Sequence, residues 1–155
     1  MRVLLKLELD AAPDAVWRGI RSPELFRAVS APLLAIRSRE PGGFPDEWSG
    51  DGPHRVAIRA LGVLPMGEQT IDAHFQERPD VRVMHDTGRP LSGALALISH
   101  WDHTMAVSEA GEGRTLFRDR LVFRAGPLTP LLWPGFWVFW QWRALQLRRR
   151  VARLR

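Results

Sequence analysis

The sequence predicts an α+β fold with one strand, two short helices, about six further strands in a meander, and one long C-terminal helix. Short runs of alternating apolar and polar residues, separated by Gly- and Pro-rich turns, predict the strands. The last 27 residues, from Thr129 onward, have helical apolar spacing and no acidic residue. Because no internal repeat or linker divides the chain, we expect a single domain over residues 1–155.

The first strand is expected over residues 3–9, where apolar side chains alternate with mostly polar ones and one face is therefore buried. Two short helices follow. The first begins around Pro13 and Asp14, because proline suits the first helical position and a carboxylate suits the first turn. The second begins after Ser22, which is a favoured N-cap residue directly before Pro23.

The remaining strands follow one another from residue 33 onward. Turn sequences such as Gly42-Gly43 and Pro79-Asp80 separate them. The expected strands cover residues 33–39, 54–61, 67–77, 81–87, 94–108 and 114–124.

An apolar stripe with spacings of three and four residues predicts that the C-terminal helix packs against a sheet. Arg143 and the later arginines fall largely off this stripe, and arginines late in a helix also favour its dipole. The stripe consists of Trp133, Trp137, Trp140, Ala144, Leu147, Val151 and Leu154.

The first half of this helix carries more aromatic surface than one face of a sheet can cover. Phe136, Phe139 and Trp142 supply the excess. Three things can cover this extra aromatic surface: a second subunit, a membrane surface, or loops near a cavity mouth. We therefore expect a homodimer or a peripheral membrane contact through these residues. A membrane span is not expected, because prolines and glycines interrupt the uncharged stretch over residues 125–142.

The formal net charge of +5 comes from the C-terminal segment alone. Residues 129–155 contain six arginines, whereas the rest of the chain has 16 basic and 17 acidic side chains. We therefore expect no nucleic-acid partner. Cysteine is absent, which excludes disulfides and thiolate chemistry, and Lys6 and Glu8 interrupt any N-terminal signal sequence. A cytoplasmic protein is expected, and the strong preference for arginine over lysine indicates a GC-rich, bacterial genome.

Several segments of this chain resemble the START-like superfamily, which is also called SRPBCC or helix-grip. The resemblance implies a curved antiparallel sheet that wraps around the terminal helix and encloses an apolar cavity. Its members include lipid-transfer domains, plant pollen allergens and polyketide cyclase/dehydratase-like proteins. The segments are the opening strand with Ala12-Pro13-Asp14-Ala15-Val16-Trp17, then Leu64-Pro65-Met66-Gly67, Ser99-His100-Trp101-Asp102-His103, Arg118-Asp119-Arg120 and the aromatic-to-arginine terminal helix.

The last two strands place one histidine and one carboxylate on the buried face of a hairpin. Period-two alternation puts His103 among the apolar residues of one strand and Asp119 among those of the next. If residues 109–113 form the loop, Ser108 pairs with Arg114 and His103 lies directly opposite Asp119, about 5 Å apart at Cβ. Because an unpaired buried carboxylate is costly, we expect the two side chains to pair.

This pair is open to a structural and a functional interpretation. It can fix the strand register and line a mostly apolar cavity, or it can, with His85, orient a polar group of a ligand. A histidine held by a carboxylate is also a common general base, so His103 and Asp119 are the candidate catalytic residues. No second catalytic group is apparent beside them, and we expect binding rather than catalysis.

We therefore expect a small hydrophobic molecule to bind between the sheet and the terminal helix. The alternatives are a polyketide cyclase/dehydratase-like enzyme that uses His103 and Asp119, and a membrane-surface or protein-interaction module that uses the terminal helix. No cofactor is expected, and no metal, because His100 and His103 face opposite sides of one strand. The expected lining residues are Phe75, His85, Trp101, His103, Met105, Phe117, Asp119, Leu121, Trp137 and Trp140.

Overall fold

The computed structural model describes residues 1–151, and its elements follow the predicted order. In this part of the chain the α-helices are α1 (Pro13–Ile20), α2 (Pro23–Ser30) and α3 (Thr129–Val151), and a short 3₁₀-helix is η1 (Gly93–Leu97). The strands are β1 (Arg2–Leu9), β2 (Leu34–Ser38), β3 (His54–Ala60), β4 (Leu64–Ile71), β5 (Ala73–Arg78), β6 (Val81–Asp86), β7 (His100–Glu109) and β8 (Thr115–Arg124).

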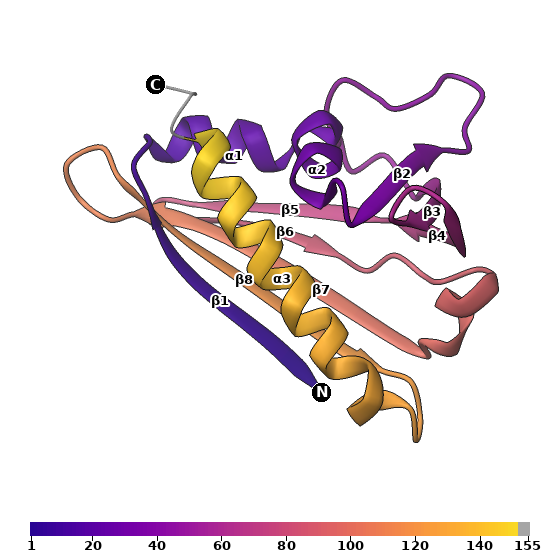
Figure 1. The fold of residues 1–155 in the computed structure, drawn as a ribbon. Coiled ribbons are helices and arrows are strands. Elements are labelled where there is room, and N and C mark those ends of the chain that lie inside the picture. Colours follow the sequence, from indigo (N-terminus) through magenta and orange to yellow (C-terminus); the bar gives the residue numbers. More distant parts are fainter. Residues whose placement is uncertain (152–155) are drawn as a thin grey trace.

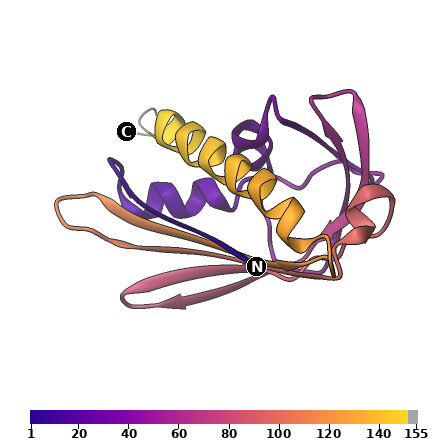
Figure 2. The same cartoon turned by 60° about the horizontal axis from the view of Figure 1, so that its bottom comes forward.

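A curved antiparallel sheet forms one side of the molecule, and the α-helices lie over one of its faces (Figure 1). Its strand order is β1-β8-β7-β6-β5, and a second antiparallel sheet has the order β2-β3-β4. In Figure 2 the long helix α3 runs above the larger sheet, while the smaller sheet and η1 stand at one end of it. The predicted α+β class, with a curved sheet that grips a long C-terminal helix, is confirmed.

The predicted strand over residues 67–77 is two strands, because the chain passes from one sheet to the other at Asp72. The backbone N–H of Asp72 donates to Asp86 Oδ1 at 2.8 Å, and the N–H of Gly88 donates to the same oxygen at 2.9 Å. The buried carboxylate of Asp86 therefore ties the bend after β4 to the end of β6. A backbone N–H that leaves a strand needs such a partner when it is shielded from water.

The predicted strand over residues 94–108 is correct only from His100 onward. The residues before it form η1, in which Leu95 is partly buried, and its C-cap residue Ile98 is buried, while their neighbours are exposed. These two side chains are three residues apart, which is the repeat of a 3₁₀-helix and not of a strand. The local apolar run gave no sign of this spacing.

The two short helices begin where the sequence places them. Pro13 and Pro23 occupy first-turn positions, and the N-cap residue Ser22 accepts a hydrogen bond from the Leu25 N–H at 3.4 Å. Val16 and Trp17 on α1 are buried in the core. Helix α1 thus packs on β7 and β8 of the larger sheet, and α2 packs beside α3 and β2.

The buried face of α3 is rotated relative to the predicted stripe. Trp140, Ala144 and Leu147 are buried as expected, but Trp137 is 45% exposed and Arg143 is only 8% exposed. The rotation has a physical cause, because α2 packs beside α3 and covers the flank on which Arg143 lies. Leu154, the last residue of the predicted stripe, lies outside the described residues.

The aromatic excess of α3 is largely covered within the fold. The indole N–H of Trp142 donates to the Ala31 carbonyl at 3.0 Å, just past the end of α2. Phe136 packs on Phe123 with 4.4 Å between ring centroids, and Phe139 packs on the Trp140 ring at 5.6 Å. A membrane contact or a homodimer through Phe136, Phe139 and Trp142 therefore stays a prediction.

None of the helices in residues 1–151 has the length and apolarity that a membrane crossing requires.

Replacing Gly88 by alanine should disrupt the junction of the two sheets. A Cβ at this position would lie 1.9 Å from the backbone carbonyl oxygen of Thr70, so the two backbone segments would have to separate. We expect the free energy of unfolding to fall by roughly 1–3 kcal/mol, the usual cost of overpacking, in urea titrations followed by tryptophan fluorescence. Gly42→Ala is the matched control, because its Cβ would meet nothing within 4 Å. Equal stability of the two variants would contradict this role of Gly88.

Candidate functional site

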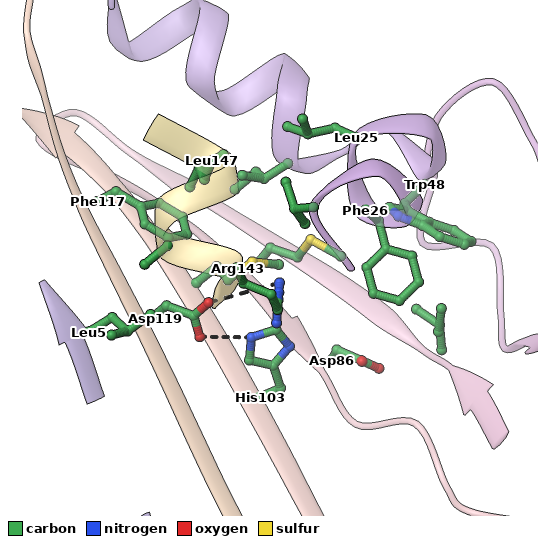
Figure 3. A pocket seen from close by; sticks show the side chains of 16 residues that line it. Leu5, Leu25, Phe26, Trp48, Asp86, His103, Phe117, Asp119, Arg143 and Leu147 are labelled. Atoms are coloured by element: carbon green, nitrogen blue, oxygen red, sulfur yellow. Dashed lines mark hydrogen bonds and ion pairs between the residues drawn. The ribbon is translucent and has the colours of Figure 1, made fainter. Parts of the chain in front are cut away.

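A buried carboxylate lies beneath the middle of α3. Asp119 on β8 is 3% exposed, and its Oδ1 accepts hydrogen bonds from His103 Nε2 at 2.9 Å and from Trp140 Nε1 at 2.8 Å. Arg143 places its Nη2 3.9 Å from Oδ2 of the same carboxylate (Figure 3). Asp119 therefore joins two neighbouring strands to the helix that covers them. The predicted contact between His103 and Asp119 is confirmed.

The predicted register of the hairpin is wrong by two residues. Ser108 pairs with Leu116 and not with Arg114, so Met105 lies opposite Asp119 and His103 is its diagonal neighbour. Arg114 is part of the turn and not of β8, and its N–H donates to the Gly111 carbonyl at 3.0 Å. A shift of two residues keeps every side chain on its predicted face, and a diagonal neighbour is still within reach of a long side chain.

The protonation of the His103–Asp119 pair follows from what each group can donate. Burial on its own would raise the pKa of Asp119, but the charge and the hydrogen bond of His103, followed by Arg143 and the Trp140 N–H, lower that pKa below its ordinary value. An ionised carboxylate only accepts hydrogen bonds, so the Nε2 atom of His103 carries a proton. The other ring nitrogen, Nδ1, lies on the side away from Asp119 (Figure 3). In the neutral imidazole this Nδ1 is an acceptor.

Two adjacent cavities lie at this cluster of polar side chains, and His103 and Arg143 line both of them. An inner cavity of about 50 Å³ lies between α2, α3 and the large sheet, and it has room for a few water molecules. An outer cavity of about 400 Å³ lies between the smaller sheet, η1 and the first half of α3, and its volume is within the usual range of small-molecule sites. Four residues line both cavities: Phe26, Asp86, His103 and Arg143.

Six of the ten predicted lining residues lie at these cavities. Met105, Phe117 and Asp119 line the inner cavity, Trp101 and Trp140 line the outer one, and His103 lines both. His103 and Met105 on β7 and Phe117 and Asp119 on β8 all lie on one face of the hairpin. Strand alternation therefore predicts their position at the inner cavity correctly.

The structure places the other four predicted residues away from both cavities. Phe75 packs edge-on against Trp17 beneath α1, and Leu121 is fully buried in the core. The side chain of His85 lies on the opposite face of the sheet, where Nε2 is 3.0 Å from Asp102 Oδ1. Trp137 is 45% exposed because the buried face of α3 is rotated toward Arg143. His85 therefore does not assist His103.

The polar lining residues that the sequence prediction missed include the ionisable Arg143 and Asp86, and also Ser30 and Gln69 in the outer cavity. Arg143 lies three residues after Trp140 and four before Leu147, so helical spacing puts it at the edge of their apolar arc, and the packing of α2 beside α3 buries it. Asp86 alternates with the buried Met84 at the end of β6, and period-two spacing would have found it. In residues 1–151 there is no group of three or more His, Asp or Glu side chains that could hold a metal ion.

Replacing Asp119 by asparagine should remove a pH-dependent part of the stability. The folded pKa is lower than the unfolded value of about 3.9, so this stabilisation is complete above that pH and is lost as the pH falls through the folded pKa. At neutral pH we expect Asp119→Asn to lower the free energy of unfolding by about 3 kcal/mol, because Arg143 loses its counter-charge. Urea titrations from neutral pH down to about pH 2 measure both effects.

Asp102→Asn is the control, because it removes a carboxylate from the solvent-facing side of the same sheet and should change stability by less than about 1 kcal/mol. The assignment fails if Asp119→Asn loses stability with acid as steeply as the unaltered protein does.

No protein-family model matches the chain, and no curated protein matches it. Solved structures match nearly its whole length. A protein from Arthrobacter aurescens has a TM-score of 0.70 at 15% identity, over 98% of this chain and 86% of that one. Norcoclaurine synthase from Thalictrum flavum, in complex with dopamine and hydroxybenzaldehyde, has a TM-score of 0.62 at 14% identity, over 99% and 87%. A protein from Chromobacterium violaceum has a TM-score of 0.64 at 14% identity, over 97% and 96%. At such identities the likeness concerns the fold alone, and the chain has the START-like (SRPBCC) helix-grip fold.

Proposed function

We propose that the protein binds a small, largely apolar molecule in the outer cavity, with the polar end of this ligand at His103. The observation that carries the proposal is a cavity of about 400 Å³ with largely apolar walls and a few polar side chains, among them Asp86, His103 and Arg143. Small-molecule sites generally have this composition, in which apolar walls supply affinity and a few polar groups fix the orientation.

The aromatic walls favour a ligand with a flat ring. Trp101, Phe136 and Trp140 surround one part of the outer cavity with centroid separations of 5.9–6.2 Å and tilted planes. Such rings pack against an aromatic ligand in edge-to-face and offset arrangements. Norcoclaurine synthase, which shares the fold, has been solved with two small aromatic molecules bound. That observation supports the same class of ligand here.

The inner cavity is too small to take such a ligand. At about 50 Å³ it holds only a few water molecules, since Phe117, Met105 and Leu147 fill the space between the sheet and the end of α3. The ligand is therefore proposed to lie under the first half of α3, with only its polar end reaching the residues shared by the two cavities.

Filling the outer cavity should abolish binding without harming the fold. Gly135 on α3 lines this cavity, and a Cβ added there would meet no other group within 4 Å. We expect Gly135→Leu to weaken the binding of ethylnaphthalene at least ~10-fold, because the leucine occupies the site of the probe. Calorimetric titration measures the affinity, and thermal unfolding verifies the fold.

Gly135→Ala is the matched control for Gly135→Leu, because it makes the same gain in helix propensity and leaves the cavity open. Undiminished binding to Gly135→Leu would place the ligand elsewhere, and the absence of binding to the unaltered protein would remove the proposed function.

Acid–base catalysis at the same site is the alternative function. The observation that favours it is the orientation of His103, because Asp119 holds Nε2 at 2.9 Å and leaves Nδ1 on the other side of the ring. A general base is commonly oriented in this way. In this alternative, Nδ1 removes a proton from a carbon next to a carbonyl group of the ligand, and the resulting enolate takes a proton back from the imidazolium.

Deuterium exchange tests this alternative without knowledge of the natural substrate. Acetylnaphthalene in D₂O should exchange its methyl protons at least ~100-fold faster with the protein than without it, and His103→Gln should return the rate to the background. Proton NMR follows the loss of the methyl signal. Exchange at the background rate with the unaltered protein would exclude proton abstraction from this ketone, and Gly135→Leu is the control for reaction outside the cavity.

A further inference from the structure

Arg143 is a buried cation whose hydrogen-bonding capacity is largely unused. The residue is 8% exposed, and its Nε–H has no acceptor within the described part of the chain. The ionic contact that it makes within the described residues is loose, because Nη2 lies 3.9 Å from Asp119 Oδ2, beyond hydrogen-bond distance. Since an unpaired buried donor costs free energy, an acceptor in the adjacent cavity would be favoured.

The side chain of Arg143 lies at the ligand site. The guanidinium carbon lies 4.9 Å from the centroid of the Trp140 ring, and the side chain lines both cavities. Figure 3 shows it beside His103, and both residues line the two cavities. Trp101 on the same outer wall has a second unused donor, because its buried indole N–H also lacks a partner in residues 1–151.

The charged side chains around the site determine which chemical group of a ligand can accept a hydrogen bond from Arg143. The carboxylate of Asp119 already lies beside the charge of Arg143, and a second acidic side chain, Asp86, lines the same outer cavity. A carboxylate on the ligand would bring a third negative charge close to Asp119 and Asp86. An ammonium group would instead be buried close to Arg143. A neutral oxygen takes the hydrogen bond and adds no charge to be desolvated.

We propose that the polar end of the ligand is a neutral carbonyl oxygen, as in an aryl ketone or aldehyde, which accepts a hydrogen bond from Arg143. The indole N–H of Trp101 is available to the same polar end. This assignment rests on the binding function proposed above and specifies the chemistry that the site recognises. Arg143 thereby becomes the residue that separates carbonyl ligands from hydrocarbons and acids of the same shape.

Three matched probes test this specificity by calorimetric titration: acetylnaphthalene, ethylnaphthalene and naphthoate. The unaltered protein should bind acetylnaphthalene at least ~10-fold more tightly than either of the others, the effect expected of one hydrogen bond to a charged donor. Arg143→Met keeps the length of the side chain and removes the donors, so the preference for the ketone over ethylnaphthalene should disappear. Arg149→Met is the control, because Arg149 is exposed on α3 and should leave the preference unchanged.

An infrared measurement adds a direct reading of the hydrogen bond. The carbonyl stretch of bound acetylnaphthalene should lie below its frequency in hexane with the unaltered protein, and it should move back toward the hexane value with Arg143→Met. If Arg143→Met does not fold, the carbonyl frequency in the unaltered protein still shows whether the bound ketone accepts a hydrogen bond. A hexane-like frequency there would overturn the assignment.

The outcomes separate this inference from the function on which it rests. Equal binding of ethylnaphthalene and acetylnaphthalene would overturn the carbonyl assignment and leave the binding function standing. Tighter binding of naphthoate would overturn the choice of a neutral acceptor. If none of the three probes binds, both the inference and the proposed function fail.

Discussion

The hydrogen bonds to the buried carboxylate of Asp119 are the interaction on which the arrangement of sheet, helix and cavity depends. One oxygen accepts from a histidine on the neighbouring strand and from a tryptophan on α3, at 2.9 and 2.8 Å. A desolvated carboxylate is tolerated only when such partners are present, so the helix cannot rotate or slide over the sheet without a large free-energy cost. The same bonds fix the tautomer of His103 and the direction of its second nitrogen.

A second carboxylate organises the opposite wall. Asp86 accepts the backbone N–H groups of Asp72 and Gly88, which lie where the chain leaves one sheet for the other. The smaller sheet is thereby held beside the end of β6, and the space between it and α3 becomes the outer cavity. The polar residues at this cavity thus include one that holds a wall in place, and the site cannot be separated from the architecture around it.

The two cavities divide the interior into a filled part and an open part. Toward the C-terminal end of α3, large apolar side chains leave only about 50 Å³. Toward its N-terminal end, the smaller sheet and η1 stand away from the helix and leave about 400 Å³. Arg143 and His103 lie at the boundary, because both line the two cavities. This geometry is the basis for proposing an apolar ligand with a single polar end.

Local patterns in the sequence determined the elements and their faces. Alternation placed Asp119 and His103 on one buried face. The first-turn proline Pro13 and the N-cap residue Ser22 located the short helices, because these signals act between residues close in the chain. The same local patterns did not predict the break of the strand at Asp72, because this break depends on a hydrogen bond to Asp86, fourteen residues away.

Only the tertiary structure decided which surfaces meet. The register of the hairpin was set by a turn that takes up Arg114, and either of two registers that differ by two residues satisfies the same pattern of faces. The rotation of α3, which buries Arg143 and exposes Trp137, was set by the neighbouring α2. A helical pattern defines an apolar arc, but the partners packed around a helix decide where that arc begins and ends.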